Sequence, residues 1–237
     1  MNEDFYEPDN ALHKKRKVHG RTFVKGMSQR QFGLLESFLP KVLLDVDILK
    51  DQGVEALFHD KKQEYWMEIG FGGGEHTARQ ARENPNVGII GCEPFQNGVA
   101  KLLTEIEEDK ISNIRVHNDD ARVVFDAMPD ASLDKLFLLY PDPWHKSKHN
   151  KRRFICEENL SQIARVLKPG ALFFVASDIP DYVSWTLRHL QNDDNFEWLA
   201  EQDQDWLLPP EGWISTRYEA KAQRAGRKSA YMFFKRK

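Results

Sequence analysis

A glycine-rich segment bounded by carboxylates is the first part of the sequence whose residue types could do chemistry. The segment EIGFGGGEHT has glutamates around a run of glycines, namely Glu68, Gly70, Gly72, Gly73, Gly74 and Glu75. Glycines between a strand and a helix let the backbone approach a ligand closely, because they lack a Cβ atom. Glu93 ends the next apolar run, nineteen residues after Gly74, and its carboxylate could accept hydrogen bonds from both hydroxyls of a ribose. These residues together predict a site for a nucleoside-containing cofactor.

An oxidoreductase that uses a dinucleotide would show a similar glycine-rich turn, followed by an acid at a similar distance. Further carboxylates in this sequence distinguish between the two classes of cofactor. Glu68 and Glu75 would repel a pyrophosphate, but they could bind the cationic end of a nucleoside that carries an amino acid. Asp119 and Asp120 follow the third apolar run, where either could reach the amino group of an adenine. Either could instead cap the helix expected to follow them. The acids favour an amino-acid-bearing nucleoside, and the roles of the two aspartates stay open.

The segment LYPDPWHKSKHNKRRF, residues 139–154, places one acid beside a basic loop. The rings of Pro141 and Pro143 restrict the backbone around Asp142 and so set the direction of its carboxylate. Trp144 could stack on a displaced nucleic-acid base, or it could pack in the core. Five cations follow, which are Lys146, Lys148, Lys151, Arg152 and Arg153. This arrangement indicates a polyanion that must be held next to an acidic pocket.

Positive charge is concentrated in three segments of a chain whose net charge is -3. Residues 14–30 hold seven Lys and Arg, residues 146–153 hold five, and residues 217–237 hold eight against the single acid Glu219. The rest of the chain is therefore strongly acidic. Such a separation predicts one face that binds a polyanion such as a nucleic acid. The alternative is that the three runs are solvated loops and tails.

The pattern of the chain predicts an α/β fold that could position these groups. Short apolar runs at 65–70, 87–93, 113–119, 134–142 and 171–178 alternate with helical stretches that begin near residues 75, 95, 121, 156 and 181. This alternation is typical of a Rossmann-like, doubly wound, mostly parallel sheet with helices on both faces. Ligands bind such sheets beyond the carboxyl ends of the strands, which is where these acids occur. A last apolar run at 229–235 predicts a strand close to the sheet edge.

The chain is expected to form one domain after a tail. Residues 1–27 are rich in Lys and Arg and lack apolar periodicity, so they predict a basic flexible tail. Ser28, with Gln31 three residues later, could cap a short entry helix that ends at Pro40. Residues 28–237 contain no internal repeat and no sign of a second domain, so we expect them to form a single domain.

Composition argues against several classes of protein. No apolar run approaches the roughly 18 residues that would cross a bilayer, and the start of the chain lacks the layout of a signal peptide. We therefore expect a cytoplasmic protein with no membrane contact. Cys92 and Cys156 are far apart, which supports neither a disulfide framework nor a zinc site. The pair His145 and His149 has no Cys or Glu at ligand spacing, so we expect no metal.

Six motifs in order resemble those of the bacterial tRNA (guanine-N7-)-methyltransferase family: EIGFGGG, GCEP, NDDA, LYPDPWHKSKHNKRRF, LKPGALFFVASD and TRYEAKAQRAG. The resemblance runs from about Gly20 to the C-terminus. The glycine motif is general among S-adenosylmethionine-dependent methyltransferases, whereas the Pro-Asp-Pro-Trp loop and the Thr-Arg-Tyr-Glu segment are specific to this family. The resemblance implies a seven-stranded class I methyltransferase fold. It also implies methyl transfer from S-adenosyl-L-methionine to N7 of a guanine in the tRNA variable loop, with S-adenosyl-L-homocysteine as product and no obligate protein partner.

The resemblance also implies roles for individual residues. It places cofactor contacts on the loop glycines and on the strand-end acids, namely Glu68, Gly70, Gly72, Gly74, Glu93, Asp120 and Asp142, and it makes Asp142 the catalytic residue. It places contacts with tRNA on Lys146, Asp178, Thr216, Arg217, Tyr218 and Glu219, with Glu219 facing either RNA or cofactor. It matches an RNA-interacting loop to Lys148, His149, Asn150, Lys151, Arg152 and Arg153. Two departures are Tyr140, where Phe is common, and Ala222, where Gly is expected.

The proposed chemistry needs no proton abstraction, because guanine N7 carries a lone pair and no proton. The site must instead place the nucleophile and the methyl group in line. Asp142, assisted by Asp178, could accept hydrogen bonds from the N1–H and amino group of guanine and face the positive charge that develops on the base.

Three other functions share part of this pattern. An amino-group methyltransferase usually has an Asp/Asn-Pro-Pro-aromatic motif, whereas the second proline is missing after Asp142. An oxidoreductase would bind a nicotinamide cofactor in place of S-adenosylmethionine. A non-catalytic RNA-binding module would not need acids at four strand ends.

Overall fold

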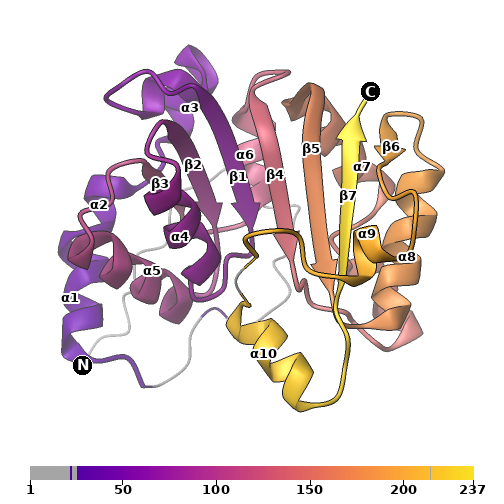
Figure 1. Ribbon diagram of the computed structural model, residues 1–237. Helices are drawn as coiled ribbons and strands as arrows, with labels where there is room; N and C mark the ends of the chain where they lie inside the picture. Colours follow the sequence, from indigo (N-terminus) through magenta and orange to yellow (C-terminus); the bar gives the residue numbers. More distant parts are fainter. Residues whose placement is uncertain (1–21, 23–25, 214) are drawn as a thin grey trace.

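The computed structural model describes residues 22, 26–213 and 215–237. Apart from Thr22, Gly26 and Met27, the predicted tail over 1–27 lies outside these residues. Seven strands form one sheet in the order β3-β2-β1-β4-β5-β7-β6 (Figure 1). Their bounds are β1 Glu64–Ile69, β2 Val87–Cys92, β3 Ile114–His117, β4 Leu133–Leu139, β5 Leu167–Ser177, β6 Phe196–Trp198 and β7 Ala230–Arg236. Strands β1 to β5 pair in parallel, whereas β7 is antiparallel to both β5 and β6. The predicted mostly parallel sheet is confirmed.

Helices cover both faces of this sheet. One face packs against α1 Gln29–Ser37, α2 Leu39–Val42, α4 Glu75–Glu83 and α5 Gln96–Glu108. The other packs against α3 Val46–Gln52, η1 Val54–Leu57, α6 Ala121–Ala127, α7 Glu157–Val166 and α8 Pro180–Gln191. The remaining elements are η2 Ser147–Arg152, α9 Gln204–Leu207 and α10 Arg217–Arg224. This is the doubly wound arrangement that the alternating pattern predicts.

Alternate residues of each central strand divide between two hydrophobic cores. On β1, Trp66 packs in the core under α4 and α5, whereas Met67 packs in the core on the α6–α8 side. Phe137 and Phe174 extend the first core across β4 and β5, where their ring centroids are 6.1 Å apart. Because both faces of the sheet are buried, the sequences of these strands are continuous apolar runs that do not alternate strictly with polar residues.

The entry helix begins as predicted but is followed by another helical turn. The Ser28 hydroxyl accepts the Gln31 N–H at 3.2 Å, and the Gln31 side chain accepts the Ser28 N–H at 3.1 Å, which completes a capping box. Pro40 does not end the helical stretch. It lies in the first turn of α2, where a missing N–H leaves no hydrogen bond unmade.

The segment between β6 and α10 crosses the sheet near the carboxyl ends of β5 and β4 and reaches the end of β1 (Figure 1). Trp213, near the end of this segment, packs against Phe174 of β5 and His76 of α4, with ring centroids 5.6 and 5.7 Å away. Arg79 of α4 donates to the Gly212 carbonyl at 3.3 Å. This crossing places α10 beside the ends of β1 and β4.

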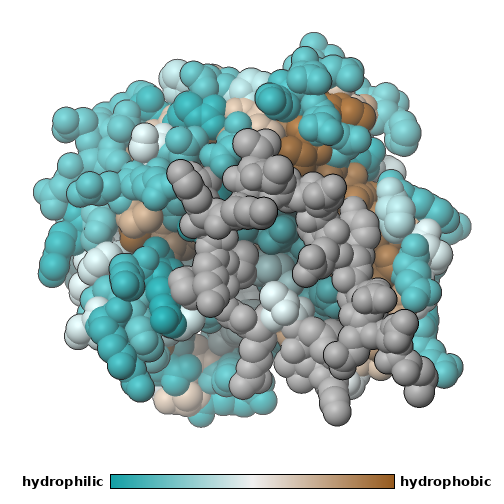
Figure 2. Space-filling view, turned by 180° about the vertical axis from the view of Figure 1, so that it is seen from behind, coloured by the Kyte–Doolittle hydropathy of each residue, from teal (hydrophilic) through white to brown (hydrophobic). Residues whose placement is uncertain are grey.

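Seen from behind, most of the described surface is hydrophilic, and hydrophobic residues gather in small areas (Figure 2). Among the described residues, no helix is long and apolar enough to span a membrane.

Candidate active site

Four acids at or just after the carboxyl ends of four different strands lie at one edge of the sheet. Ile69 of β1 pairs with Cys92 of β2, and Cys92 pairs with His117 of β3, so the carboxyl ends of these strands are side by side. Ile69 also pairs with Leu138 of β4. The structure therefore brings to one edge the predicted acids Glu68, Glu93, Asp120 and Asp142.

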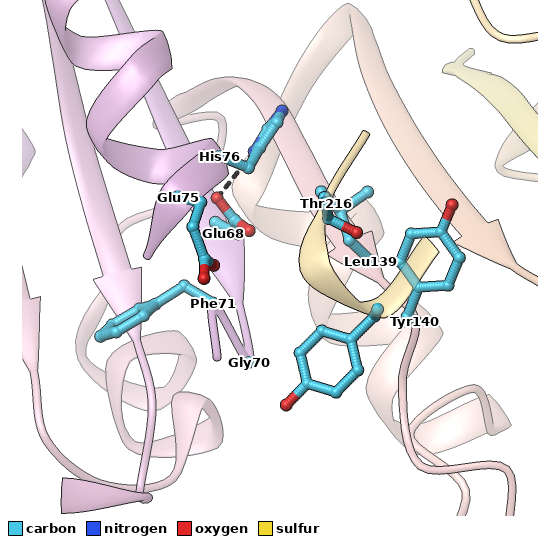
Figure 3. Close-up of a pocket in the computed structure, with 9 residues that line it drawn as sticks. Glu68, Gly70, Phe71, Glu75, His76, Leu139, Tyr140 and Thr216 are labelled. Carbon is cyan, nitrogen blue, oxygen red and sulfur yellow. Dashed lines mark hydrogen bonds and ion pairs between the residues drawn. The ribbon is translucent and has the colours of Figure 1, made fainter. Parts of the chain in front are cut away.

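Glu68 is buried at the end of β1 and is held by the first turn of α4. Thr77 Oγ1 donates to Glu68 Oε2 at 2.6 Å, and His76 Nδ1 lies 2.8 Å from the same oxygen (Figure 3). Both contacts fix the direction of the carboxylate. Sequence reasoning did not name His76 or Thr77. The available signal was their position directly after the glycine run, on a helix that begins there.

Gly72 of the glycine-rich loop has close neighbours on two sides. Its φ is 59°, in the left-handed region, and a Cβ atom there would lie 2.8 Å from the Tyr218 ring. On the other side, a Cβ atom on Gly98 of α5 would lie only 2.0 Å from the Gly72 carbonyl oxygen. The close approach therefore needs glycine at Gly72 in the loop and at Gly98 on α5. Gly98 was not predicted, and its signal is a glycine in the first turn of an amphipathic helix.

Glu93 joins two loops at the end of β2. Its Oε2 accepts the Gly72 N–H at 2.7 Å, and its Oε1 accepts the Phe95 N–H at 2.9 Å. Burial raises the pKa of Glu93, and the charges of Asp142 and Glu68 raise it further against the two backbone hydrogen bonds. A carboxylate with two oxygens retains capacity to accept more hydrogen bonds.

Asp120 caps α6. Its Oδ1 accepts the Arg122 N–H at 3.0 Å, and the Arg122 guanidinium binds the same carboxylate. Asp119 Oδ1 in turn accepts the Asp120 N–H at 2.7 Å. The capping alternative is confirmed for Asp120, and its contact with an adenine stays a prediction.

Asp142 lies in a turn whose two ends are strained. Tyr140 and Trp144 have φ values of 50° and 45°, a region that bulky residues rarely adopt. The Tyr140 N–H donates to the Ala176 carbonyl at 2.8 Å, and the Tyr140 hydroxyl donates to Ser229 Oγ at 3.0 Å. Asp142 is open to solvent, but partial burial of its carboxyl raises its pKa. The turn is thus held by the neighbouring strands as well as by its two prolines.

The start of α10 faces the glycine-rich loop. Thr216 caps this helix by accepting the Glu219 N–H at 3.2 Å. Tyr218 lies over Gly72, and burial raises the pKa of its phenol, with a further contribution from the charges of Glu93 and Asp142. The exposed Arg217 has its Nε 3.9 Å from Glu75. Three of the predicted substrate residues therefore lie beside the predicted cofactor residues.

Glu219 does not face the cleft, so the prediction that it contacts RNA or cofactor is not supported by its position. Its side chain is buried, with Trp213 Nε1 donating to Oε2 at 2.6 Å and the Tyr231 hydroxyl donating to Oε1. Gln223 Nε2 adds a contact at 3.3 Å. These donors attach α10 to β7 and to the crossing segment, because a buried carboxylate requires hydrogen-bond partners.

The lysines of the basic loop are exposed, whereas its two arginines contact other side chains. Lys146, Lys148 and Lys151 are exposed, while the Arg152 guanidinium lies 5.0 Å from the Trp144 ring. His149 and Asn150, also predicted to contact RNA, are half-buried in η2. Arg153 has no exposed side-chain surface and forms an ion pair with Asp181. The burial of this cation does not support its predicted role as a surface contact for RNA.

Asp178 follows β5 and is half-buried. Its Oδ2 accepts from Arg227 Nε at 2.6 Å. The predicted guanine contact by Asp178 would have to share this carboxylate with the Arg227 guanidinium.

A cleft opens between the glycine-rich loop, the end of β4 and the start of α10 (Figure 3). Its lining comprises Glu68, Gly70, Phe71, Glu75, His76, Leu139, Tyr140, Thr216 and Tyr218. Its carboxylates suit the ammonium and hydroxyl groups of a ligand, and its apolar walls suit a purine. These residues fit an amino-acid-bearing nucleoside. Among the described residues, no group of three or more His, Cys, Asp or Glu is placed to hold a metal ion.

Comparison with known proteins identifies similar chains. A family model described as "Putative methyltransferase" matches residues 62–232. The chain is 52% identical to a tRNA (guanine-N(7)-)-methyltransferase of Rhizobium meliloti over 217 residues, which cover 92% of this chain and 94% of that protein. It is 47% identical over 218 residues to a protein of the same name from Brucella anthropi, with 92% and 94% covered.

Solved structures share this fold. The 16S rRNA methyltransferase KamB aligns with a TM-score of 0.54 at 15% identity, covering 74% of this chain and 88% of KamB. TrmN from Thermus thermophilus aligns with a TM-score of 0.52 at 13% identity, covering 74% and 45%. At such identities the likeness concerns the fold alone. It confirms the predicted Rossmann-like methyltransferase fold.

Proposed function

Because the chain belongs to the tRNA (guanine-N(7)-)-methyltransferase family, we propose that it transfers a methyl group from S-adenosyl-L-methionine to N7 of a guanine in the variable loop of tRNA. The observation that carries this proposal is the position of Asp142. It follows the end of β4, where Leu139 and Tyr140 line the same cleft as Glu68 and Tyr218. In keeping with this position, its charge contributes to the raised pKa of Glu93 and of Tyr218. Asp142 therefore stands where the predicted cofactor residues meet the predicted substrate residues.

The residues around the cleft suggest how S-adenosyl-L-methionine would be held. Glu68, whose direction is fixed by His76 and Thr77, suits the ammonium of the amino-acid part. Glu93 suits the two ribose hydroxyls, since its oxygens are already oriented by the backbone of Gly72 and Phe95. When bound, the cofactor supplies an electrophilic methyl group on sulfur, and S-adenosyl-L-homocysteine is the product.

The protein need not remove a proton from the base, because guanine N7 is an acceptor with a free lone pair. What the site must provide is orientation, which accounts for about 7–11 kcal/mol of a barrier when two reactants are held in line. The turn around Asp142 is suited to that task, since Tyr140 is hydrogen-bonded before it and the Pro143 carbonyl accepts from Arg153 after it. Rigid positioning is therefore the main contribution of this chain.

Asp142 is the proposed catalytic residue. As a carboxylate it would accept hydrogen bonds from the N1–H and the amino group of guanine, a pair of donors that adenine lacks at these positions. Its negative charge would also face the positive charge that develops on the imidazole ring during transfer. Asp178 would assist only in part, because Arg227 already binds its carboxylate.

The exposed cations Lys146, Lys148 and Lys151 lie directly after the Asp142 turn. They would bind tRNA phosphates and so offset the repulsion between the RNA and the acids of the cleft. We also propose that the cations of residues 14–30 bind tRNA phosphates. We place the reaction in the cytoplasm, without an obligate protein partner.

A labelling experiment tests this proposal. The purified protein is incubated with unmodified tRNA and S-adenosyl-L-methionine that carries a labelled methyl group, and the digested RNA is analysed by mass spectrometry. We expect label in N7-methylguanosine, and we expect Asp142→Ala to abolish it while Asp126→Ala, an exposed position on α6, retains it. Label in another nucleoside would overturn the target, and RNA binding without label would overturn the activity.

A further inference from the structure

Arg153 is buried, whereas the lysines of the same basic loop are exposed. No part of its side chain is exposed, although Lys148 and Lys151 in the same loop are exposed. Its guanidinium lies 4.8 Å from the Trp185 ring and 5.6 Å from the Tyr182 ring, both on α8. A cation in this position cannot reach a phosphate without leaving the core.

The guanidinium connects α8 to the turn that carries Asp142. Arg153 Nε donates to the Pro143 carbonyl oxygen at 2.9 Å, and Nη2 binds the Asp181 carboxylate. Pro143 is the residue after Asp142, so this contact fixes the backbone on the carboxyl side of the acid. On the other side, Tyr140 is bound to the Ala176 carbonyl of β5. The turn is therefore attached on both sides of Asp142, and the attachment on the carboxyl side depends on Arg153.

We propose that Arg153 is a positioning residue that holds the Asp142 turn against α8, and that it does not bind RNA. This inference rests on the proposed function of Asp142. It gives one basic loop two separate tasks. The exposed lysines bind the substrate, and the buried arginine sets the direction of the catalytic carboxylate.

Arginine suits this task better than lysine for geometric reasons. Its planar guanidinium presents donors in a fixed fork, which here serves Pro143 and Asp181 at once, and it lies 4.8 Å from the Trp185 ring. A lysine would keep the charge and most of the stem but would lose the fork. Arg153→Lys therefore separates charge from positioning.

The test compares Arg153→Lys with Lys151→Gln, an exposed neighbour in the same loop. For each variant we would measure kcat at saturating tRNA, the Kd for tRNA at several salt concentrations, and the pH dependence of kcat. For Arg153→Lys we expect kcat to fall about 10- to 100-fold, as for a misplaced catalytic group, with the tRNA Kd and its salt slope unchanged. For Lys151→Gln, which removes a proposed phosphate contact, we expect weaker tRNA binding and a smaller salt slope.

The pH profile distinguishes positioning from a general structural role. Burial raises the pKa of Asp142, so a turn that has moved toward solvent should show the acid limb of kcat at lower pH. Loss of folded protein alone would lower the amplitude of the profile and leave its midpoint in place. A shifted midpoint supports positioning, and an unshifted midpoint with reduced amplitude overturns it.

A second variant keeps the test decisive if Arg153→Lys folds poorly. The Asp181 side chain is 68% exposed, so Asp181→Ala removes one partner of the Arg153 guanidinium without leaving a cavity in the core. We expect a smaller fall in kcat, again without a change in the tRNA salt slope. The proposal is overturned if either variant reduces the salt slope or keeps the wild-type kcat. These results are distinct from failure of the proposed function, in which the wild-type protein itself would form no N7-methylguanosine.

Discussion

The backbone N–H of Gly72 donates to Oε2 of Glu93 at 2.7 Å and so ties the loop after β1 to the acid after β2. The other oxygen of Glu93 accepts the Phe95 N–H. One carboxylate therefore orders both the loop predicted to carry the amino-acid part of the cofactor and the start of α5. The shape of the cofactor site depends on a residue whose predicted role is to bind a ribose.

Glu93→Gln tests this double role. The amide keeps the shape of the side chain, but its NH2 group would meet one of the two backbone N–H donors, and the charge that suits ribose hydroxyls is lost. Hydrogen bonds to charged groups contribute about 1.5–3 kcal/mol, so we expect S-adenosyl-L-methionine to bind roughly 10- to 100-fold more weakly. Isothermal titration calorimetry measures this affinity. Glu36→Gln, on the exposed side of α1, is the matched control, and equal affinities in the two variants would exclude the role of Glu93.

Gly72→Ala tests the close approach of Tyr218 to the loop. The new methyl group would lie 2.8 Å from the Tyr218 ring, so the ring must move or the loop must shift. Gly170→Ala is a matched control, because its φ of 84° imposes similar backbone strain with no atom within 4 Å of the new Cβ. We expect both variants to lose about 1 kcal/mol of stability from strain.

Only Gly72→Ala should also weaken cofactor binding and reduce kcat. Chemical denaturation gives the stability of both variants, and titration gives their cofactor affinity. Combining Gly72→Ala with Tyr218→Ala would relieve the contact with the ring and leave the strain. If the single and double variants bind the cofactor equally, Tyr218 does not limit the loop.

Much of the fold could be predicted from the sequence because buried parallel strands produce a repeated local signal. The runs ending at Glu93 and Asp142 are long and apolar, and each is followed by a turn and a helical stretch. By contrast, β6 has only three residues, which is too short for any periodicity. Pro40 was expected to end a helix, but proline fits the first turn of a following helix equally well.

The site acids were predicted from their position at strand ends, since topology alone brings those ends together. The directions of Arg153 and Glu219 could not be predicted in that way. Arg153 is buried by Trp185 and Asp181, about 30 residues later in the chain, and Glu219 is bound by Trp213 and Tyr231 on two other segments. Long-range partners decide whether a charged side chain is buried, and local sequence does not contain them.

The exposed lysines of the basic loop predict a salt-dependent contribution to RNA binding. The double variant Lys148→Gln and Lys151→Gln should bind tRNA about ten-fold more weakly and should reduce the slope of log K against log salt by about 1–2, because each lost phosphate contact removes roughly 0.7–0.9. Filter binding over a range of salt concentrations measures both quantities. Lys50→Gln is a suitable control, since Lys50 is exposed on α3, at the opposite end of the sheet from α10 (Figure 1). A slope that does not change would exclude direct phosphate contacts by the two lysines.

Asp142→Asn should separate activity from stability. Burial raises the pKa of Asp142 in the folded protein above the ordinary aspartate value of 3.8, which applies to the unfolded chain. At a pH between 3.8 and this raised pKa, the folded protein binds more protons than the unfolded chain, so the free energy of unfolding falls as the pH rises. At higher pH the carboxylate is ionised in both states, and its burial destabilises the folded protein by a constant amount. Removing the charge should then raise the unfolding temperature at pH 7.5 by about 1–2 °C, a small change for a domain of this size.

The kcat of Asp142→Asn should fall, although its unfolding temperature should rise. An amide presents an NH2 group where guanine needs an acceptor, so we expect kcat on saturating tRNA to fall at least about 100-fold, comparable to the loss of a preorganised electrostatic group. In the wild-type protein the acid limb of kcat should have its midpoint above the ordinary aspartate value, because only the ionised carboxylate accepts both donors. Thermal unfolding at pH 7.5 and pH 4.5, together with single-turnover kinetics, measures these effects. If Asp142→Asn unfolds at a lower temperature than the wild type at pH 7.5, or keeps a near-normal kcat, the charge of Asp142 is structural and another group stabilises the methylated base.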